Sequence, residues 1–75
     1  MAVAELLAAR RKEAGLTQAA LASQLGRHQS FVATIERGGR RVDVVEFLEF
    51  ADAIGFDPCQ ELTLVRKSVA KRPRR

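Results

Sequence analysis

The sequence is poor in the residues that hold small proteins together covalently or through metals. Its 75 residues include one cysteine, Cys59, and one histidine, His28. One cysteine excludes an intrachain disulfide, and together with one histidine it leaves too few ligands for a structural zinc site. We therefore expect no metal and no other cofactor, and we interpret Cys59 as a small residue at a helix start without redox chemistry.

Long apolar runs are also missing. No run approaches the roughly 18 residues of a membrane-spanning helix, and the first residues, MAVAELLAARRKEAG, lack the basic-then-apolar order of a signal peptide. A chain of 75 residues forms one domain with a small core, which argues against a deep catalytic cleft. We expect a soluble cytoplasmic protein that contacts no membrane. It is not expected to be an enzyme, because nucleophile, paired-carboxylate and phosphate-loop motifs are all lacking.

Proline is scarce, with two residues in the chain, and β-branched residues do not alternate with polar ones. Alanine, leucine, glutamate and arginine instead form short segments that end at glycines, which is typical of helices. The sequence therefore predicts an all-α fold. The expected helices run from about Val3 to Ala14, from the Thr17 cap to Gly26, from His28 or Gln29 to before Gly38, from the Asp43 cap to Gly55, and from the Asp57 cap onward.

The fourth of these segments has the clearest start signal. Asp43 and Glu46 form a capping box, and Val42 and Phe47 flank it as a hydrophobic staple. The period of 3.6 residues then gives the helix one apolar face. The residues expected on that buried face are Val44, Phe47, Leu48, Ala51 and Ile54.

Basic residues outnumber acidic ones. Thirteen Lys and Arg against nine Asp and Glu give a formal net charge of +4, which favours a polyanionic partner such as nucleic acid. The alternative is an inert basic surface. We divide the chain into a folded domain, 1–68, and a basic C-terminal tail, 69–75, that we expect to be flexible and to add non-specific DNA affinity.

The second and third predicted helices are short and joined by a tight glycine turn, which is the shape of a helix-turn-helix. The stretch GLTQAALASQLGRHQSFVATIERG resembles the DNA-binding domain of the Cro and lambda-type repressor family, also called the xenobiotic-response-element (XRE) family. The resemblance extends from about Leu7 to Pro58. It implies a compact five-helix bundle whose third helix enters the DNA major groove. The matching positions are Arg11, Gly15, Leu16, Thr17, Gln18, Leu21, Ala22, Gly26, Gln29, Ser30, Val32, Ile35, Glu36 and Gly38.

The resemblance also implies roles for single residues. Gln18 matches a glutamine that binds a phosphate and braces a second glutamine at the start of the third helix. Gln29 matches that second glutamine, which reads an adenine edge. Further base contacts are implied for Ser30, Ala33 and Thr34. Phosphate contacts are implied for Arg27, His28, Arg37, Arg40 and Arg41.

Some of these assignments have a structural alternative. His28 is either a helix cap or a phosphate contact. Arg40 and Arg41 are either phosphate contacts or solvated charge. Phe31 lies between the inner and outer faces of its helix, so it is either partial core or a groove contact.

Arg11 and Glu36 are charged residues on apolar helix faces. Arg11 shares its face with Val3, Leu7 and Ala14. An unpaired buried charge is very costly, and the resemblance implies that Arg11 and Glu36 form a salt bridge between the first and third helices. We therefore assign both residues to structure and not to DNA contact.

One short reading helix contacts few bases, so we expect a homodimer on a two-fold operator in double-stranded DNA. Phe50 and Leu64 lie slightly off the main faces of their helices, and they either form the self-contact or widen the core. The function predicted is that of a sequence-specific transcriptional regulator, acting as a repressor. The alternative is the antitoxin of a toxin–antitoxin pair, in which the same fold also holds a toxin partner.

Overall fold

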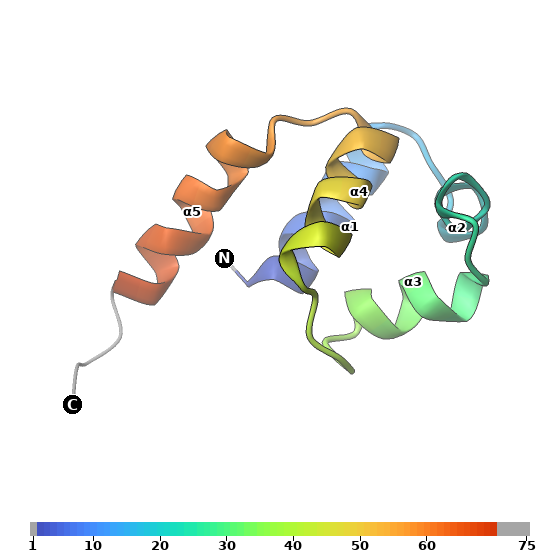
Figure 1. Cartoon of the computed structure of the whole chain (residues 1–75), viewed down its shortest axis with the longest axis horizontal. Helices are drawn as coiled ribbons and strands as arrows, with labels where there is room; N and C mark the ends of the chain where they lie inside the picture. The colour runs from blue at the N-terminus through green and yellow to red at the C-terminus, as the bar shows by residue number, and fades with distance from the viewer. Residues whose placement is uncertain (1, 71–75) are drawn as a thin grey trace.

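The computed structural model describes residues 2–70, with side chains described up to residue 67. This range contains five α-helices and no strand (Figure 1), which confirms the predicted all-α architecture. The helices are α1 (Val3–Glu13), α2 (Gln18–Leu25), α3 (Gln29–Glu36), α4 (Val44–Ile54) and α5 (Pro58–Ala70). Within that range, none of them is both long and apolar enough to cross a membrane. The expected tail begins inside α5, and its residues 71–75 lie outside the described residues.

Helix starts are fixed by side chains that accept hydrogen bonds from the first backbone amides. At the start of α2, Thr17 Oγ1 accepts from the Ala20 N–H at 3.0 Å. At the start of α4, Asp43 Oδ1 accepts from the Glu46 N–H at 2.7 Å, and Glu46 Oε1 accepts from the Asp43 N–H at 3.1 Å. The predicted capping box is therefore formed, and it satisfies two amides that lack partners within the helix.

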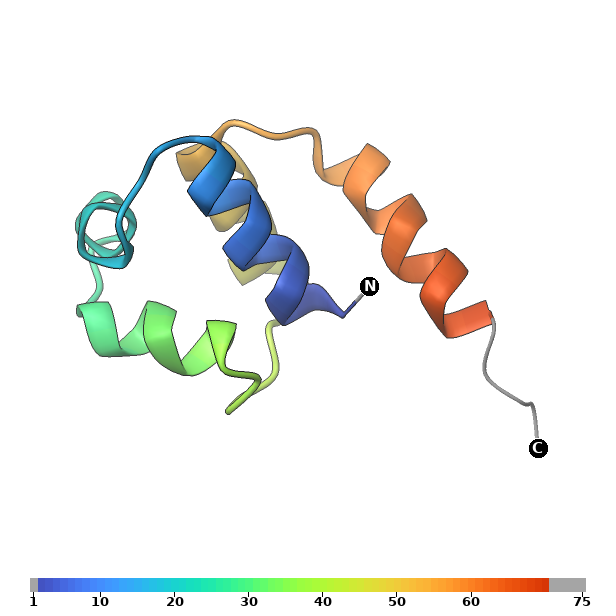
Figure 2. The same ribbon diagram turned by 180° about the vertical axis from the view of Figure 1, so that it is seen from behind.

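The first four helices surround one core, and α5 lies against its side. α1 and α4 pack on each other in the centre, α2 and α3 form one flank, and α5 forms the other (Figure 1, Figure 2). The buried apolar side chains are Leu6, Leu7, Leu21, Ala22, Val32, Ile35, Phe47, Phe50 and Ala51. From α5, Val65 packs against this core and is partly buried. The core therefore holds α3 by its inner face and leaves the outer face to solvent.

The orientation of α4 differs from the expected one. Val44 and Leu48 were expected in the core but are 73% and 44% exposed, whereas Phe50 is 1% exposed. The rings of Phe50 and Phe31 pack with their centroids 6.2 Å apart, and such an aromatic pair buries more apolar surface than a valine and a leucine would. The prediction that Phe50 forms the self-contact is therefore wrong, and its alternative, a wider core, is correct.

The burial of two other residues, Ala14 and Phe31, can be compared with the expectations from the sequence. Ala14, expected on the buried stripe of the first helix, is exposed because α1 ends at Glu13 and Ala14 is its C-cap. Phe31 is partly buried against the core, which agrees with its interpretation as partial core. Its ring therefore contributes to the fold from α3.

An ion pair that the sequence did not predict connects α5 to α1. Arg10 Nε donates to Glu61 Oε1 at 2.7 Å, and Arg10 Nη1 donates to Glu13 Oε2 at 2.6 Å. These contacts raise the pKa of Arg10 above its ordinary value, with the Glu61 hydrogen bond as the largest cause. The Arg10 guanidinium is therefore a permanent charge between the two helices.

Candidate nucleic-acid interface

α2 and α3 are held at an angle by a glycine turn and by their shared core. Gly26 ends α2 in the left-handed conformation, with φ of 68°, which favours a residue without a side chain. The Arg27 N–H then donates to the Ala22 C=O at 2.9 Å and closes the turn. Since the inner faces of both helices are buried in the core, the two form the predicted helix-turn-helix.

The start of α3 is polar and open to solvent. Arg27, His28, Gln29 and Ser30 are all exposed. His28 occupies the N-cap position, but its side chain forms no capping hydrogen bond. The Phe31 N–H donates to the His28 C=O at 3.0 Å, so the Gln29 and Ser30 N–H groups and the positive end of the helix dipole are what α3 offers to an anion such as a phosphate.

A chain of hydrogen bonds fixes the Gln29 amide. Gln18 Nε2 donates to Glu36 Oε1 at 3.0 Å, and Gln29 Nε2 donates to Gln18 Oε1 at 3.3 Å. Because a carboxylate can only accept, Gln18 must turn its NH₂ group toward Glu36 and its oxygen toward Gln29. Gln29 is left with its oxygen and one N–H, which is the acceptor–donor pair that matches an adenine edge.

Glu36 is anchored in turn by Arg11. Arg11 Nε and Nη2 donate to the two carboxylate oxygens of Glu36 at 2.7 and 2.9 Å, and Arg11 Nη1 donates to the Leu16 C=O at 2.7 Å. The two charged side chains are 10% and 7% exposed. Burial by itself raises the pKa of Glu36, but the hydrogen bonds from Arg11 and Gln18 outweigh burial and lower that pKa. The structure thus brings together the two residues assigned to a structural salt bridge.

The remaining candidates for base contact continue along α3. Ala33 and Thr34 are partly buried. Thr34 Oγ1 lies 3.5 Å from Arg37 Nη2 and accepts a long hydrogen bond from it. The Thr34 hydroxyl accepts this hydrogen bond but keeps its own O–H for a base, whereas its methyl group faces Gly39 of the segment after α3.

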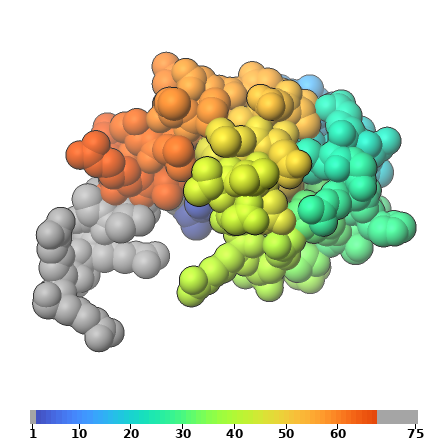
Figure 3. Space-filling view, viewed as in Figure 1, coloured from blue at the N-terminus to red at the C-terminus, as the bar shows by residue number. Residues whose placement is uncertain are grey.

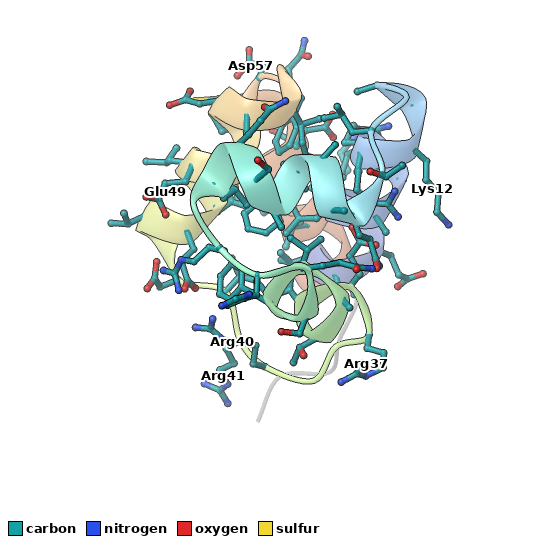
Figure 4. The ribbon with its side chains drawn as sticks, turned by 90° about the vertical axis from the view of Figure 1, so that its right-hand side faces the viewer. Lys12, Arg37, Arg40, Arg41, Glu49 and Asp57 are labelled. Atoms are coloured by element: carbon teal, nitrogen blue, oxygen red, sulfur yellow. The ribbon has the colours of Figure 1, made fainter. Side chains whose placement is uncertain are left out.

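Three of the predicted phosphate contacts belong to the C-cap of α3 and to the segment that follows it. Figure 4 shows Arg37, Arg40 and Arg41 below α3, whereas the acidic Asp57 lies at the opposite end of the molecule. The segment that connects α3 to α4, coloured yellow-green, projects from the surface (Figure 3). Arg37 and Arg41 are exposed and form no ion pair with the described residues.

Arg40 takes part in a cluster that the sequence analysis missed. Arg40 Nη2 donates to Glu46 Oε2 at 3.0 Å. The guanidinium carbons of Arg27 and Arg40 lie 4.4 and 5.0 Å from the centre of the Phe31 ring. No helical spacing could have revealed the cluster, because Arg27 precedes α3 and the contact of Arg40 with Glu46 depends on the path of a connecting segment.

Comparisons with known proteins agree with this geometry. A family model described as a helix-turn-helix domain matches residues 2–64. The structure of an XRE-family-like protein from Pseudomonas syringae pv. tomato str. DC3000 is 46% identical in sequence, with a TM-score of 0.73, covering 93% of this chain and 82% of that chain. The restriction-modification controller protein C.AhdI from Aeromonas hydrophila is 36% identical, with a TM-score of 0.69, covering 73% of this chain and 80% of that chain. A search of curated proteins gives no match.

The family match spans the helix-turn-helix and the helices on both sides of it. Both solved structures share the fold over most of this chain. Their sequence identities of 46% and 36% indicate a relationship in sequence as well as in fold. The resemblance seen in the sequence is thereby confirmed. The chain belongs to the XRE family of helix-turn-helix DNA-binding domains.

Proposed function

We propose that this protein is a sequence-specific transcriptional regulator that inserts α3 into the major groove and acts as a repressor. The observation that carries the proposal is the exposed Gln29 amide, held by Gln18, which is itself held by Glu36. An amide that is oriented before binding loses little side-chain freedom when it meets a base edge. One structural relative is a restriction-modification controller, which supports a regulatory role, and repression needs no activity beyond occupying a promoter.

Base reading would begin at Gln29. Its oxygen can accept from adenine N6–H while its N–H donates to N7, a bidentate contact that distinguishes adenine from the other bases. Ser30 follows and would contact the next base pair through its hydroxyl. Ala33 would present its methyl group, which suits contact with a thymine methyl, and Thr34 would present its hydroxyl to a base edge.

Phosphate contacts would come from both ends of α3. At its start, Arg27, His28 and the first amides of the helix offer positive charge and hydrogen-bond donors. At its end, Arg37 and Arg41 are exposed and free of ion pairs among the described residues. Contacts on both sides of the groove would fix the register of α3, because phosphate contacts orient a protein while base contacts specify the sequence.

We infer that the protein binds its operator as a homodimer. Val44, Val45 and Leu48 of α4 and Leu62 of α5 are exposed by 73%, 66%, 44% and 46%. Val44, Leu48 and Leu62 line one groove between the two helices. Clustered apolar surface of this kind is typical of protein–protein contacts, and the same face of a second copy would cover it across a two-fold axis. Leu64, the candidate from the sequence, is 39% exposed and stays a prediction.

Selection of bound sequences from a random pool of double-stranded DNA tests the proposed function. We expect two-fold sites whose half-sites lie about 34 Å apart, one turn of the double helix. The oligomeric state of the protein should be measured alongside, and a single unrepeated motif bound by a monomer would count against the dimer. A toxin that co-purifies with the protein from its source cells would instead support the antitoxin alternative.

Gln29→Ala tests the base-reading assignment. It should relax the preference at one base pair per half-site, by about 1–3 kcal/mol of discrimination. The melting temperature should stay near the wild-type value because Gln29 is exposed. Gln18→Ala is the matched comparison, and it should weaken binding to all sequences with a smaller loss of preference. If Gln29→Ala keeps the wild-type preference at every position, the assignment of Gln29 is wrong.

A further inference from the structure

Arg40 differs from the other basic residues near α3 in its surroundings. Its Nη2 donates to Glu46 Oε2 at 3.0 Å and to Glu46 Oε1 at 3.3 Å. Its guanidinium carbon lies 5.0 Å from the centre of the Phe31 ring. The Arg40 side chain is 41% exposed and that of Glu46 is 10% exposed. Arg40 is therefore the counter-ion of the nearly buried Glu46 carboxylate, and its side chain also shields that carboxylate from solvent.

Without Arg40, the negative charge of Glu46 would lack a counter-ion among the described residues. Its other hydrogen bond among the described residues comes from the Asp43 N–H at 3.1 Å. Removing the cation from a nearly buried carboxylate leaves an uncompensated charge, which is strongly unfavourable. A DNA phosphate would have to compete with Glu46 for the guanidinium, so Arg40 has little charge to offer to the backbone.

The segment that carries Arg40 is held closely against α3. The Gly39 N–H donates to the Thr34 C=O at 2.9 Å. A Cβ atom at Gly39 would lie 3.0 Å from Thr34 Cγ2, so a side chain there would fit only if Thr34 shifted slightly. Arg40 then bridges from this segment to α3 and α4. Arg41, the next residue, is exposed and forms no ion pair with the described residues.

We propose that Arg40 is a positioning residue and that Arg41 is the phosphate contact of this pair, an assignment that rests on the proposed DNA-binding function. By joining Phe31 at the start of α3 to Glu46 at the start of α4, Arg40 holds the recognition helix and the connecting segment in one arrangement. Arg41 is thereby presented at a fixed distance from α3. The two neighbouring arginines, expected from the sequence to act alike, have different roles.

The salt dependence of DNA binding separates the two roles. Each phosphate contact that is lost reduces the slope of log Kobs against log salt concentration by about 0.9. We expect Arg41→Ala to flatten the slope by this amount. Arg40→Ala should lower the affinity at every salt concentration and keep the wild-type slope. Arg40→Lys retains a charge that can bind phosphate but loses the planar group that lies over Phe31, so it too should bind more weakly with an unchanged slope.

Glu46→Gln tests the same assignment from the partner residue. Glutamine keeps an oxygen that can accept from the Asp43 N–H, and it removes the charge that holds Arg40. Glu49→Gln is the control, because it removes a negative charge from an exposed position of the same helix. Relative to that control, Glu46→Gln should bind DNA more weakly with the wild-type slope. Tighter binding with a steeper slope would mean that Arg40, once released, contacts phosphate.

Folding of each variant is checked by thermal unfolding, and binding is measured well below the lowest melting temperature. If selection from a random pool of double-stranded DNA yields no sequence that the wild-type protein binds, the proposed function itself is refuted. A wild-type protein that binds normally, together with an Arg40→Ala variant that flattens the slope as Arg41→Ala does, would overturn only the positioning role of Arg40.

Discussion

At the residue scale, Glu36 joins the stability of the fold to the proposed reading of DNA. Its carboxylate accepts from Arg11 of α1 and from Gln18 of α2, and Gln18 accepts from Gln29. The direction of the Gln29 amide therefore depends on a carboxylate at the other end of α3. A substitution at Glu36 should disturb the fold and the orientation of the reading residue together.

The pairing of Arg11 with Glu36 predicts a strong coupling between them. Arg11→Ala and Glu36→Ala should each destabilise the protein by about 3–5 kcal/mol, because each leaves the other charge nearly buried and uncompensated. The double variant should lose less than the sum of the two. Chemical denaturation of all four proteins gives this double-mutant cycle, and additive losses would show that the two charges do not stabilise each other.

The lowered pKa of Glu36 predicts acid sensitivity. Since the folded protein holds this carboxylate in its charged form more strongly than the unfolded chain does, the stabilising effect is complete above the unfolded value of about 4.3. The effect is lost as pH falls through the lower pKa of the folded state. The difference in unfolding free energy between wild type and Glu36→Gln should therefore shrink below about pH 4.

The Arg11→Ala background provides the control for this pH dependence. Arg11 supplies the hydrogen bonds that chiefly oppose the effect of burial on Glu36. In that background, the unfolding free energies with and without the Glu36→Gln substitution are compared as a function of pH. The difference between them should no longer shrink in acid. A decrease of unchanged size would show that Arg11 is not the cause of the lowered pKa of Glu36.

At the element scale, the turn between α2 and α3 depends on the backbone of Gly26. Its φ of 68° is left-handed, and an added Cβ would meet nothing within 4 Å. Any cost of substitution therefore comes from backbone conformation and not from a clash. Gly26 thus contributes to the angle between α2 and α3 through its backbone conformation alone, whereas the buried side chains of both helices contribute through packing.

Gly26→Ala should destabilise the protein by about 1–2 kcal/mol, the cost of the left-handed conformation for a residue with a Cβ. Gly26→Asn should cost less, because asparagine tolerates this conformation better. Thermal unfolding of the three proteins measures the order of stability. Equal losses for alanine and asparagine would point to a steric cause instead.

At the scale of the whole molecule, the proposed dimer requires the apolar face of α4 and α5. Val44→Glu and Leu62→Glu should raise the dimer dissociation constant by at least about tenfold, since each places a charge in the apolar groove. The monomer should stay folded because both side chains are substantially exposed. Sedimentation equilibrium and circular dichroism measure the two effects.

Gln60→Glu is the matched control for the dimer variants. It adds the same charge to an exposed residue of α5, on the opposite side of the helix from Leu62 at about 100° per residue. This variant should dimerise like the wild type. If all three charged variants dimerise equally well, the self-contact lies on another surface of the molecule.

Local signals in the sequence were sufficient to determine the five helices and the helix-turn-helix. Thr17 and Asp43 cap the helices that follow them, and Gly26 and Gly55 end helices in the left-handed conformation. Each of these signals acts within one turn of backbone, so it does not depend on the rest of the fold. The matching positions between Leu7 and Pro58 indicated the family. That resemblance implied a pairing of Arg11 with Glu36, and the structure brings these two residues into contact.

Only the tertiary structure decided which face of α4 is buried and what Arg40 does. Periodicity permits several rotations of a helix with apolar residues on most sides, and the contact of Phe50 with the Phe31 ring selects one of them. The same packing brings Arg40 to Glu46 and Phe31, and brings Arg10 to Glu61, 51 residues away in sequence. These contacts join residues of different helices, or a helix and the segment between α3 and α4, so they exist only once the helices have packed.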